Sequence, residues 1–208
     1  MGSSNSVYIP DYFRQKDFDE IRRFIEENPF AFLLFPEGDE VSTTLIPMIH
    51  EVEDGKLVIY GHMARNNPQW EKAMDKKVTI LFFGPHHYIS PRWYEIRKSV
   101  PTWNYVSVRM SGTFKIMKRK ETEDFLIRLS TFLDSKWRGE RREKEAYYQK
   151  MVEEIVAFRI ESKTLDAVWK LSQNHPLSDR KGVVENLEKA GDDDAVKMAG
   201  MMRKTMEK

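Results

Sequence analysis

The stretch from Tyr60 to Trp70 gathers the residues of this sequence that are best suited to bind an anion. It reads Y-G-H-M-A-R-N-N-P-Q-W. A strand that ends at Gly61 and a helix that begins at Pro68 would leave His62, Arg65 and two asparagines on the connection, where backbone N–H groups and a guanidinium can converge on an anion. The pattern predicts a phosphate pocket. A polar loop before a capped helix is also an ordinary connection, so these residues alone leave both interpretations open.

Four aromatic residues further along the chain form a second candidate group. They are Trp93, Tyr94, Trp103 and Tyr105, and they stand close to prolines. Core packing or a subunit interface is one interpretation of such a group. The other is a wall for a flat aromatic ligand, because tryptophans on proline-containing loops suit that role.

Several kinds of chemistry have no support in the sequence. The histidines at positions 50, 62, 86 and 87 lack the spacing and the accompanying carboxylates of a metal site. The chain contains no cysteine, which excludes disulfides, thiolate metal sites and cysteine nucleophiles. It also lacks a G-x-S-x-G elbow, a Walker loop and a dinucleotide fingerprint. No residue is placed by the sequence as a catalytic acid or base, so the catalytic residues stay unknown.

Composition predicts one folded domain in the cytoplasm. The 208 residues are enough for a substantial core, and the formal net charge of +1 does not call for nucleic acid or an anionic membrane as a partner. No apolar run approaches the length of a membrane span, and no signal peptide is evident. Residues 1–6 are expected to be a tail or a cloning remnant.

A basic stretch lies between Ser135 and Glu145. Its cations are Lys136, Arg138, Arg141, Arg142 and Lys144, interleaved with three glutamates. The interleaving favours a solvated charged surface over a nucleic-acid patch.

The first half of the chain reads as short strands with tight turns. Asp17 is expected to cap a helix that ends before Pro29, and Phe30–Phe35 is an apolar run of strand length. Strands are then expected over 41–50 and 56–60, with an Asp-Gly hairpin between them.

The remaining elements are expected at the following positions. A short helix covers 68–74, strands cover 78–83 and 86–89 with a break at Gly84 and Pro85, and a further strand runs through Phe114. A helix over 121–133 and a strand over 155–161 follow. Many short strands with brief connections predict a mainly β (α+β) fold, an antiparallel barrel with peripheral helices. The domain is expected to cover 7–175, with a helical C-terminal extension over 176–208.

Four motifs together resemble one family. They are G-H-M-A-R-N-N-P-Q-W from Gly61, S-P-R-W-Y from Ser90, V-P-T-W-N-Y from Val100 and K-L-S-Q-N from Lys170. In this combination and order they resemble the PaiB-type FMN-binding split-barrel proteins, described as negative transcriptional regulators. The resemblance extends from Tyr8 to beyond Asn174. Leu45 departs from it, because a histidine is expected there, and so does the stretch 135–148.

The resemblance implies a split β-barrel that dimerises and holds FMN at the subunit interface. The T-x-x-P strand from Thr44 would lie along the isoalloxazine ring, the segment from Gly61 would receive the ribityl chain and the phosphate, and Trp103 with the Lys170 cluster would close the site. The cofactor-binding positions implied are Thr43, Thr44, Leu45, Pro47, Gly61, His62, Met63, Ala64, Arg65, Asn66, Trp103, Lys170, Gln173 and Asn174.

Three functions remain open from the sequence. The leading expectation is an FMN-binding homodimeric flavoprotein, which would be an oxidoreductase acting on a nicotinamide or another small molecule. The alternative is a PaiB-like transcriptional regulator without catalysis, with DNA as a weakly supported partner. The third is an interaction protein whose pocket is vestigial.

Overall fold

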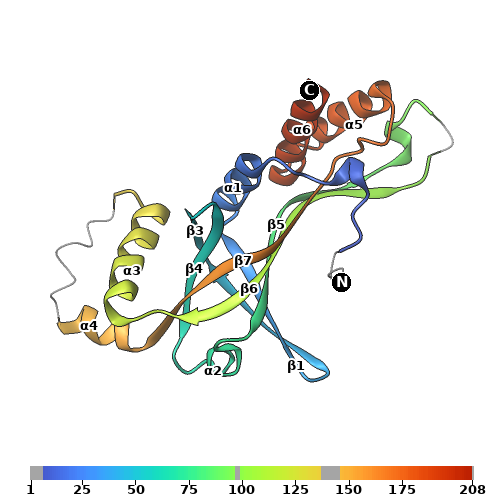
Figure 1. Cartoon of the computed structure of the whole chain (residues 1–208). Coiled ribbons are helices and arrows are strands. Elements are labelled where there is room, and N and C mark those ends of the chain that lie inside the picture. The colour runs from blue at the N-terminus through green and yellow to red at the C-terminus, as the bar shows by residue number, and fades with distance from the viewer. Residues whose placement is uncertain (1–6, 97–98, 137–145, 208) are drawn as a thin grey trace. The chain divides into compact units, whose positions relative to one another are not determined.

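The computed structural model describes residues 7–96, 99–136 and 146–207 (Figure 1). Seven strands form one sheet in the order β2-β1-β5-β6-β7-β4-β3. Their bounds are β1 Phe30–Glu37, β2 Glu40–Pro47, β3 Ile49–Glu53, β4 Lys56–Ala64, β5 Lys77–Ile89, β6 Thr102–Ile116 and β7 Ile155–Lys170. The helices are η1 Asp11–Phe13, α1 Phe18–Glu27, α2 Gln69–Ala73, η2 Pro91–Trp93, α3 Arg119–Leu133, α4 Ala146–Glu153, α5 Leu177–Ala190 and α6 Asp193–Met206.

The chain divides into two compact units. The barrel unit comprises residues 22–82 and 109–165, and the helical unit comprises residues 1–21, 83–108 and 166–208. Strands β5, β6 and β7 each contribute residues to both units.

The two edge strands of the sheet are neighbours along the chain. Strand β2 is at one end of the strand order and β3 is at the other, yet only Met48 separates them. The sheet must therefore curl until its edges meet at Met48, which is fully buried and donates its N–H to the carbonyl of Pro29 over 2.8 Å. The single strand expected over 41–50 is thus wrong. Pro47 has no N–H to continue a ladder, and the chain changes edge directly after it.

Strand β4 is longer than the sequence indicated. It was expected to end near Gly61, but it pairs with β7 as far as the Ala64–Ile155 pair. Gly61 lies inside the strand because a Cβ there would come within 2.7 Å of the Phe158 ring and 3.3 Å of Ile46. The glycine therefore permits close packing inside the barrel and does not mark a strand end.

Other turns follow the expected chemistry. Asp54 and Gly55 join β3 to β4 with φ angles of 48° and 75°, the left-handed pair of a tight hairpin, which confirms the Asp-Gly prediction. The break expected at Gly84 and Pro85 is wrong, since β5 continues through both residues.

Helix α3 covers one outer face of the barrel unit. Phe125 is fully buried there and joins a cluster with Leu129, Tyr60, Val58, Ile49, Met117 and Ala157. Burial of a side chain of this size contributes about 1.5–3 kcal/mol, so the cluster holds α3 firmly on β3, β4 and β7.

The helical unit is built around the α5–α6 pair. Asp192 caps α6 by accepting from the N–H of Ala195 over 2.9 Å, and Asp193 and Asp194 follow in the first turn. Asp179 on α5 is fully buried and accepts from the backbone N–H of Glu95 over 2.9 Å. Helix α5 also approaches η2 closely, because a Cβ on Gly182 would come within 2.3 Å of the Trp93 carbonyl.

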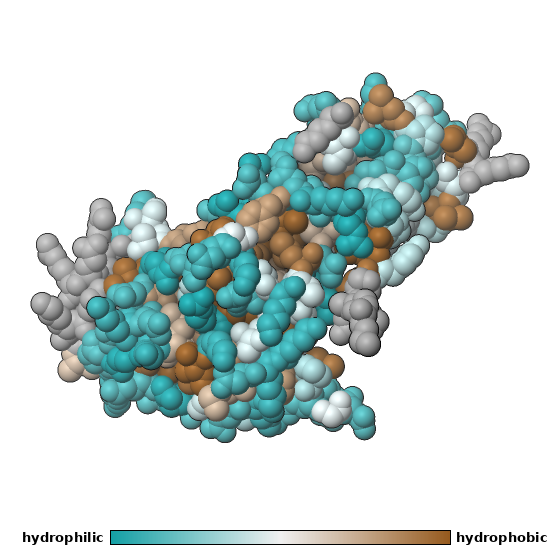
Figure 2. All heavy atoms as spheres, viewed as in Figure 1, coloured by the Kyte–Doolittle hydropathy of each residue, from teal (hydrophilic) through white to brown (hydrophobic). Residues whose placement is uncertain are grey.

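Apolar side chains form patches on a mostly hydrophilic surface (Figure 2). Within the described part of the chain, no helix is long and apolar enough to span a membrane. The same residues contain no group of three or more His, Cys, Asp or Glu that could hold a metal ion. Most of the basic stretch, residues 137–145, and the tail 1–6 lie outside the described residues.

Candidate functional site

Two of the predicted binding segments lie together in the barrel unit. The side-chain amide of Asn67, in the turn after β4, donates to the Thr44 hydroxyl on β2 over 3.1 Å. Deeper in the barrel, Gly61 faces Ile46 of the same strand. The T-x-x-P strand and the G-H-M-A-R-N segment therefore form one continuous part of the barrel unit.

Strand β2 presents an open edge. As the terminal strand of the sheet it pairs only with β1 among the described residues, so half of its backbone N–H and C=O groups lack a strand partner there. Thr43 and Leu45 point outward, and Leu45 is 47% exposed, whereas Thr44 and Pro47 are half-buried. The open edge combines an exposed apolar side chain with backbone donors and acceptors.

His62 points away from the barrel interior. Side chains alternate along β4, so Gly61 and Met63 face inward while His62 and Ala64 face outward. The His62 ring meets the edge of Phe125 on α3 with a centroid distance of 6.1 Å. Burial lowers the pKa of His62 below its usual value of 6.5, and its Nδ1 has no hydrogen-bond partner within the described residues. The imidazole is therefore neutral at pH 7.

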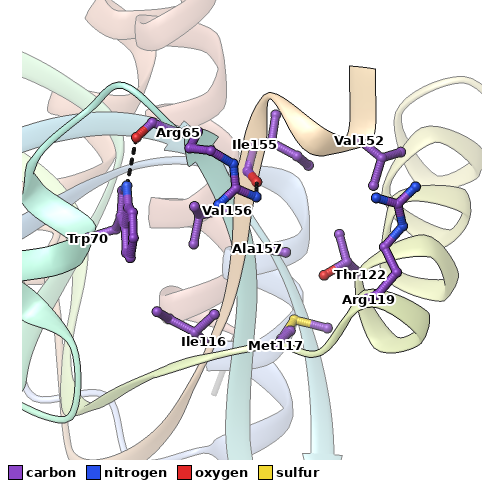
Figure 3. Close-up of a pocket in the computed structure, with 10 residues that line it drawn as sticks. All are labelled: Arg65, Trp70, Ile116, Met117, Arg119, Thr122, Val152, Ile155, Val156 and Ala157. Carbon is purple, nitrogen blue, oxygen red and sulfur yellow. Dashed lines mark hydrogen bonds between the residues drawn. The ribbon is translucent and has the colours of Figure 1, made fainter. Parts of the chain in front are cut away.

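The Arg65 guanidinium is anchored on the backbone at the start of β7 (Figure 3). Its Nε donates to the carbonyl of Glu153 over 2.5 Å and its Nη2 donates to that of Ile155 over 2.7 Å. Its own carbonyl accepts from the indole N–H of Trp70 over 2.8 Å. The side chain was predicted to be free for a phosphate, but only Nη1 has no partner among the described residues.

Asn66 is the open donor of the turn. It is exposed, and neither its backbone N–H nor its side-chain amide makes a hydrogen bond within the described residues. The next residue, Asn67, accepts from the N–H of Gln69 over 3.0 Å, just before α2, whose N-cap position is Pro68.

Gln69 was missed by the sequence analysis. It is 1% exposed and donates to the carbonyls of Ser42 over 3.0 Å and Leu33 over 3.4 Å, so it links α2 to β1 and β2. Its Oε1 is buried without a partner in the described chain. The only indication in the sequence was its position in the N-P-Q-W motif. A glutamine in a short helix does not by itself predict a buried side chain.

The remaining predicted positions lie in the helical unit, where Trp103 and Lys170 are on opposite sides of β6. Lys170 donates to the Thr102 hydroxyl over 2.7 Å, and burial lowers the pKa of its ammonium group. Trp103 follows Thr102 in β6 and therefore points to the opposite face, where it is 53% exposed and lies against His86 and Tyr88. Trp103 and Lys170 do not face one shared space within this unit.

Gln173 and Asn174 differ in their availability. Gln173 accepts from the N–H of Leu171 and donates to the carbonyl of Trp169, so both ends of its amide serve the local turn. Asn174 is exposed and makes no hydrogen bond within the described residues.

The predicted aromatic group does not assemble as one cluster. Tyr94 stacks on His175 with a centroid distance of 4.5 Å, Trp93 lies 6.0 Å from His87, and Trp103 pairs with other rings. Each of these rings therefore packs against a histidine and not against the other members of the group.

Comparison with known proteins adds a family and a fold. The family model described as "Putative FMN-binding domain" matches residues 7–164. The protein named "Protease synthase and sporulation protein PAI 2" of Bacillus subtilis (strain 168) is 34% identical over 212 residues, which cover 97% of this chain and 99% of that protein.

Solved structures share the architecture at low identity. The FAD and heme binding protein from Mycobacterium smegmatis has a TM-score of 0.60 at 11% identity, covering 76% of this chain and 73% of that one. The flavocytochrome Anf3 from Azotobacter vinelandii also has a TM-score of 0.60, at 12% identity, covering 80% and 74%. At such identities the likeness shows the fold alone, and it agrees with the expected split barrel.

Proposed function

The chain belongs to the FMN-binding domain family whose model spans residues 7–164, and from this membership we propose that it is a flavoprotein that binds FMN between two copies of itself. The observation that carries the proposal is the hydrogen bond from Asn67 to Thr44. This bond places β2, the strand proposed to lie along the flavin ring, in contact with the turn after β4, which is proposed to bind the phosphate.

The donors at the turn fit a phosphate. An FMN phosphate is a dianion, and it is best held by charged and backbone donors that have no other partner. Arg65 offers Nη1 on a guanidinium that the barrel already fixes, and Asn66 offers its backbone N–H and side-chain amide. His62 is directed to Phe125, so the phosphate is assigned to Arg65 and Asn66.

The edge of β2 fits a flavin ring. An isoalloxazine needs an apolar surface and a few backbone partners for its polar rim. Leu45 supplies exposed apolar surface, and the unpaired side of β2 supplies N–H and C=O groups beside Thr43. The other predicted positions, Gly61, Met63, Ala64 and Pro47, shape the barrel wall and the strand ends.

A second copy of the chain is the proposed cover for this edge. Phe30, Val41 and Leu45 of the β1–β2 hairpin are 57%, 61% and 47% exposed, an unusual concentration for a pair of strands facing water. Light scattering of the purified protein is expected to give the mass of a dimer, and a monomeric mass with bound FMN would contradict this part of the proposal.

FMN binding is tested by the visible spectrum of the purified protein and by FMN titration of the flavin-free protein. Asn66→Asp places a negative charge in the assigned phosphate site, so FMN affinity should fall at least about tenfold. Thr131→Asp adds the same charge on an exposed part of α3 and should leave affinity unchanged. A protein that neither retains nor binds FMN would overturn the proposal.

The helical-unit positions are tested separately. Asn174→Asp should weaken FMN binding if the K-L-S-Q-N motif contributes to the site, as the resemblance implies. An unchanged affinity would confine the site to the barrel unit and, in a dimer, to residues outside this motif.

Bound FMN would supply hydride or electron transfer, so an oxidoreductase acting on a small molecule is the proposed activity. The role of the chain would be to hold the ring at the β2 edge and the phosphate at the turn. Stopped-flow mixing with NADH or NADPH is expected to bleach the flavin absorbance. Failure with both would favour a role without catalysis.

Regulation without catalysis is the second candidate function. The relative from Bacillus subtilis is named for protease synthase and sporulation, and not for a flavin-dependent reaction. Gel-shift experiments with promoter DNA at several salt concentrations separate the two candidates, because binding through a basic surface weakens steeply as salt rises.

A further inference from the structure

A small pocket in the barrel unit has an apolar floor and two arginines at its rim (Figure 3). Its volume is about 180 Å³, and its floor is formed by buried side chains of β7, of α4 and of the residue after β6: Val156, Ala157, Val152 and Met117. Ile116, Ile155 and the indole of Trp70 complete the walls. A cavity of about 150 Å³ with apolar walls holds one benzene ring, so this space suits a single aromatic ring and is too small for a flavin.

Two arginines border the pocket from different elements. Arg65 comes from the turn after β4 and Arg119 from the first position of α3, and their guanidinium groups lie on opposite sides of Ala157 in Figure 3. Nε of Arg119 donates to the Glu123 carboxylate over 2.6 Å, and its Nη2 donates to the side-chain oxygen of Gln149. Its Nη1 has only a long contact of 3.9 Å to the Glu153 carboxylate, and Nη1 of Arg65 has no partner among the described residues.

The two rim arginines differ in their carboxylate partners. Glu123 neutralises Arg119 in part, and Glu153, whose side chain is 69% exposed, is the other carboxylate beside that guanidinium. Arg65 is held by carbonyl groups and keeps its full positive charge without a carboxylate partner within the described residues. Both arginines are thus fixed in position, and Nη1 of Arg65 has no partner among the described residues while Nη1 of Arg119 has only the 3.9 Å contact with Glu153.

We propose that this pocket is a second ligand site that takes a small aromatic carboxylate. The ring occupies the apolar floor between Trp70 and Val156, and the carboxylate lies at the mouth, where it accepts from Nη1 of Arg65 and replaces the long Glu153 contact at Nη1 of Arg119. The site is separate from the FMN site, although Arg65 borders both, because Nη1 carries two N–H groups and can donate one to each ligand. A single-ring acid bound in this pocket would contact α3, α4 and the turn after β4 of the flavoprotein at the same time.

Calorimetric titration of the full-length, FMN-loaded protein tests the proposal, with benzoate as the probe. Benzoate should bind saturably with one site per chain, and benzamide, which has the same shape without the charge, should bind at least about tenfold more weakly. Arg119→Gln should weaken benzoate at least about tenfold, whereas Lys120→Gln, the exposed neighbour on α3, should not. Glu153→Gln should tighten benzoate several-fold, because it removes a competing carboxylate.

Ile116→Trp provides a test that leaves both arginines in place. Ile116 is 38% exposed at the rim, so a tryptophan there can fill the pocket from the solvent side and should abolish benzoate binding. The FMN affinity of Arg119→Gln should equal that of the wild type, which separates failure of this site from failure of the flavin site. Equal binding of benzamide and benzoate, displacement of benzoate by added FMN, or no saturable binding would each overturn the proposal.

Discussion

The guanidinium of Arg65 donates to the backbone carbonyl of Ile155 over 2.7 Å. Ile155 is the first residue of β7, and the Glu153 carbonyl that Arg65 also binds is at the end of α4. The arginine therefore joins the turn after β4 to the end of α4 and the start of β7, which follow 88 and 90 residues later in the sequence. The main role of the Arg65 side chain is to hold these elements together. Its Nη1 group is the part of the guanidinium that remains for a ligand.

Arg65→Lys should separate these two roles. Lysine keeps the charge but cannot reach two carbonyls as a planar fork. The free energy of unfolding should fall by about 1 kcal/mol, since the bonds are solvent-exposed, and FMN affinity should fall at least about tenfold. Urea unfolding and FMN titration measure the two effects, with Arg92→Lys as the control. An unchanged FMN affinity would remove Arg65 from the phosphate site.

Thr44→Val should loosen the link between β2 and the turn after β4. Valine keeps the shape of threonine but cannot accept the Asn67 amide, so the free energy of unfolding should fall by up to about 1 kcal/mol. FMN affinity should fall several-fold because the two segments lose their fixed spacing. Thr43→Val is the stability control, since the Thr43 hydroxyl makes only a 3.5 Å contact with Val41. Equal stability of the two variants would contradict the argument.

Gly112→Ala and Gly200→Ala should have opposite effects on stability. A Cβ at Gly112 would lie 2.1 Å from the backbone carbonyl oxygen of Glu161, which cannot move without breaking the sheet. Unfolding free energy should fall by about 3 kcal/mol or more. Gly200 is inside α6 with nothing near the added atom, so alanine there should stabilise by about 0.5–1 kcal/mol. Thermal unfolding compares the pair, and a stable Gly112→Ala variant would contradict the close approach.

His62 should make the protein less stable in mild acid. Burial lowers its pKa from 6.5, so the unfolded chain takes up the proton more readily than the folded one. This contribution to stability is complete above about pH 6.5 and is lost as the pH falls through the lowered value. His62→Gln should flatten the decline in urea midpoint below pH 6.5.

His50 contributes to the same decline, since burial and then the charge of Arg22 lower its pKa while Glu26 opposes the shift. His50→Gln should therefore remove a further part of the slope, and the double variant should be the least sensitive to acid. Parallel profiles for all variants would show that neither imidazole is held neutral by the fold.

The sequence was most informative where local chemistry decides the structure. Asp17 caps α1 through the N–H groups of Asp19 and Glu20, and the Asp54–Gly55 turn has the expected backbone angles. Strand identity was also readable from apolar runs. The change from one sheet edge to the other at Met48 could not be read from the sequence. The pattern of residues 41–50 looks like one strand, and it does not indicate that its two halves pair with different strands.

The candidate site was predictable as a set of segments but not as directions of side chains. The approach of Thr44 to the turn after β4 agrees with the resemblance to FMN-binding proteins. The anchoring of Arg65 on α4 and β7, the burial of Gln69 and the opposite orientations of Trp103 and Lys170 depend on strand length and register. These are fixed by pairings between distant parts of the chain, which the motifs themselves do not encode.

The single residue between β2 and β3 sets a limit on how this family can vary. Side chains alternate along both strands, so inserting one residue at Met48 would exchange the inward and outward positions of β3 and turn Ile49 away from its cluster with Phe125 under α3. Insertions are tolerated at most loops, but here the length of the link is tied to the register of both sheet edges. The hairpin turns of this barrel should therefore accept insertions, whereas the link at Met48 should accept only substitutions.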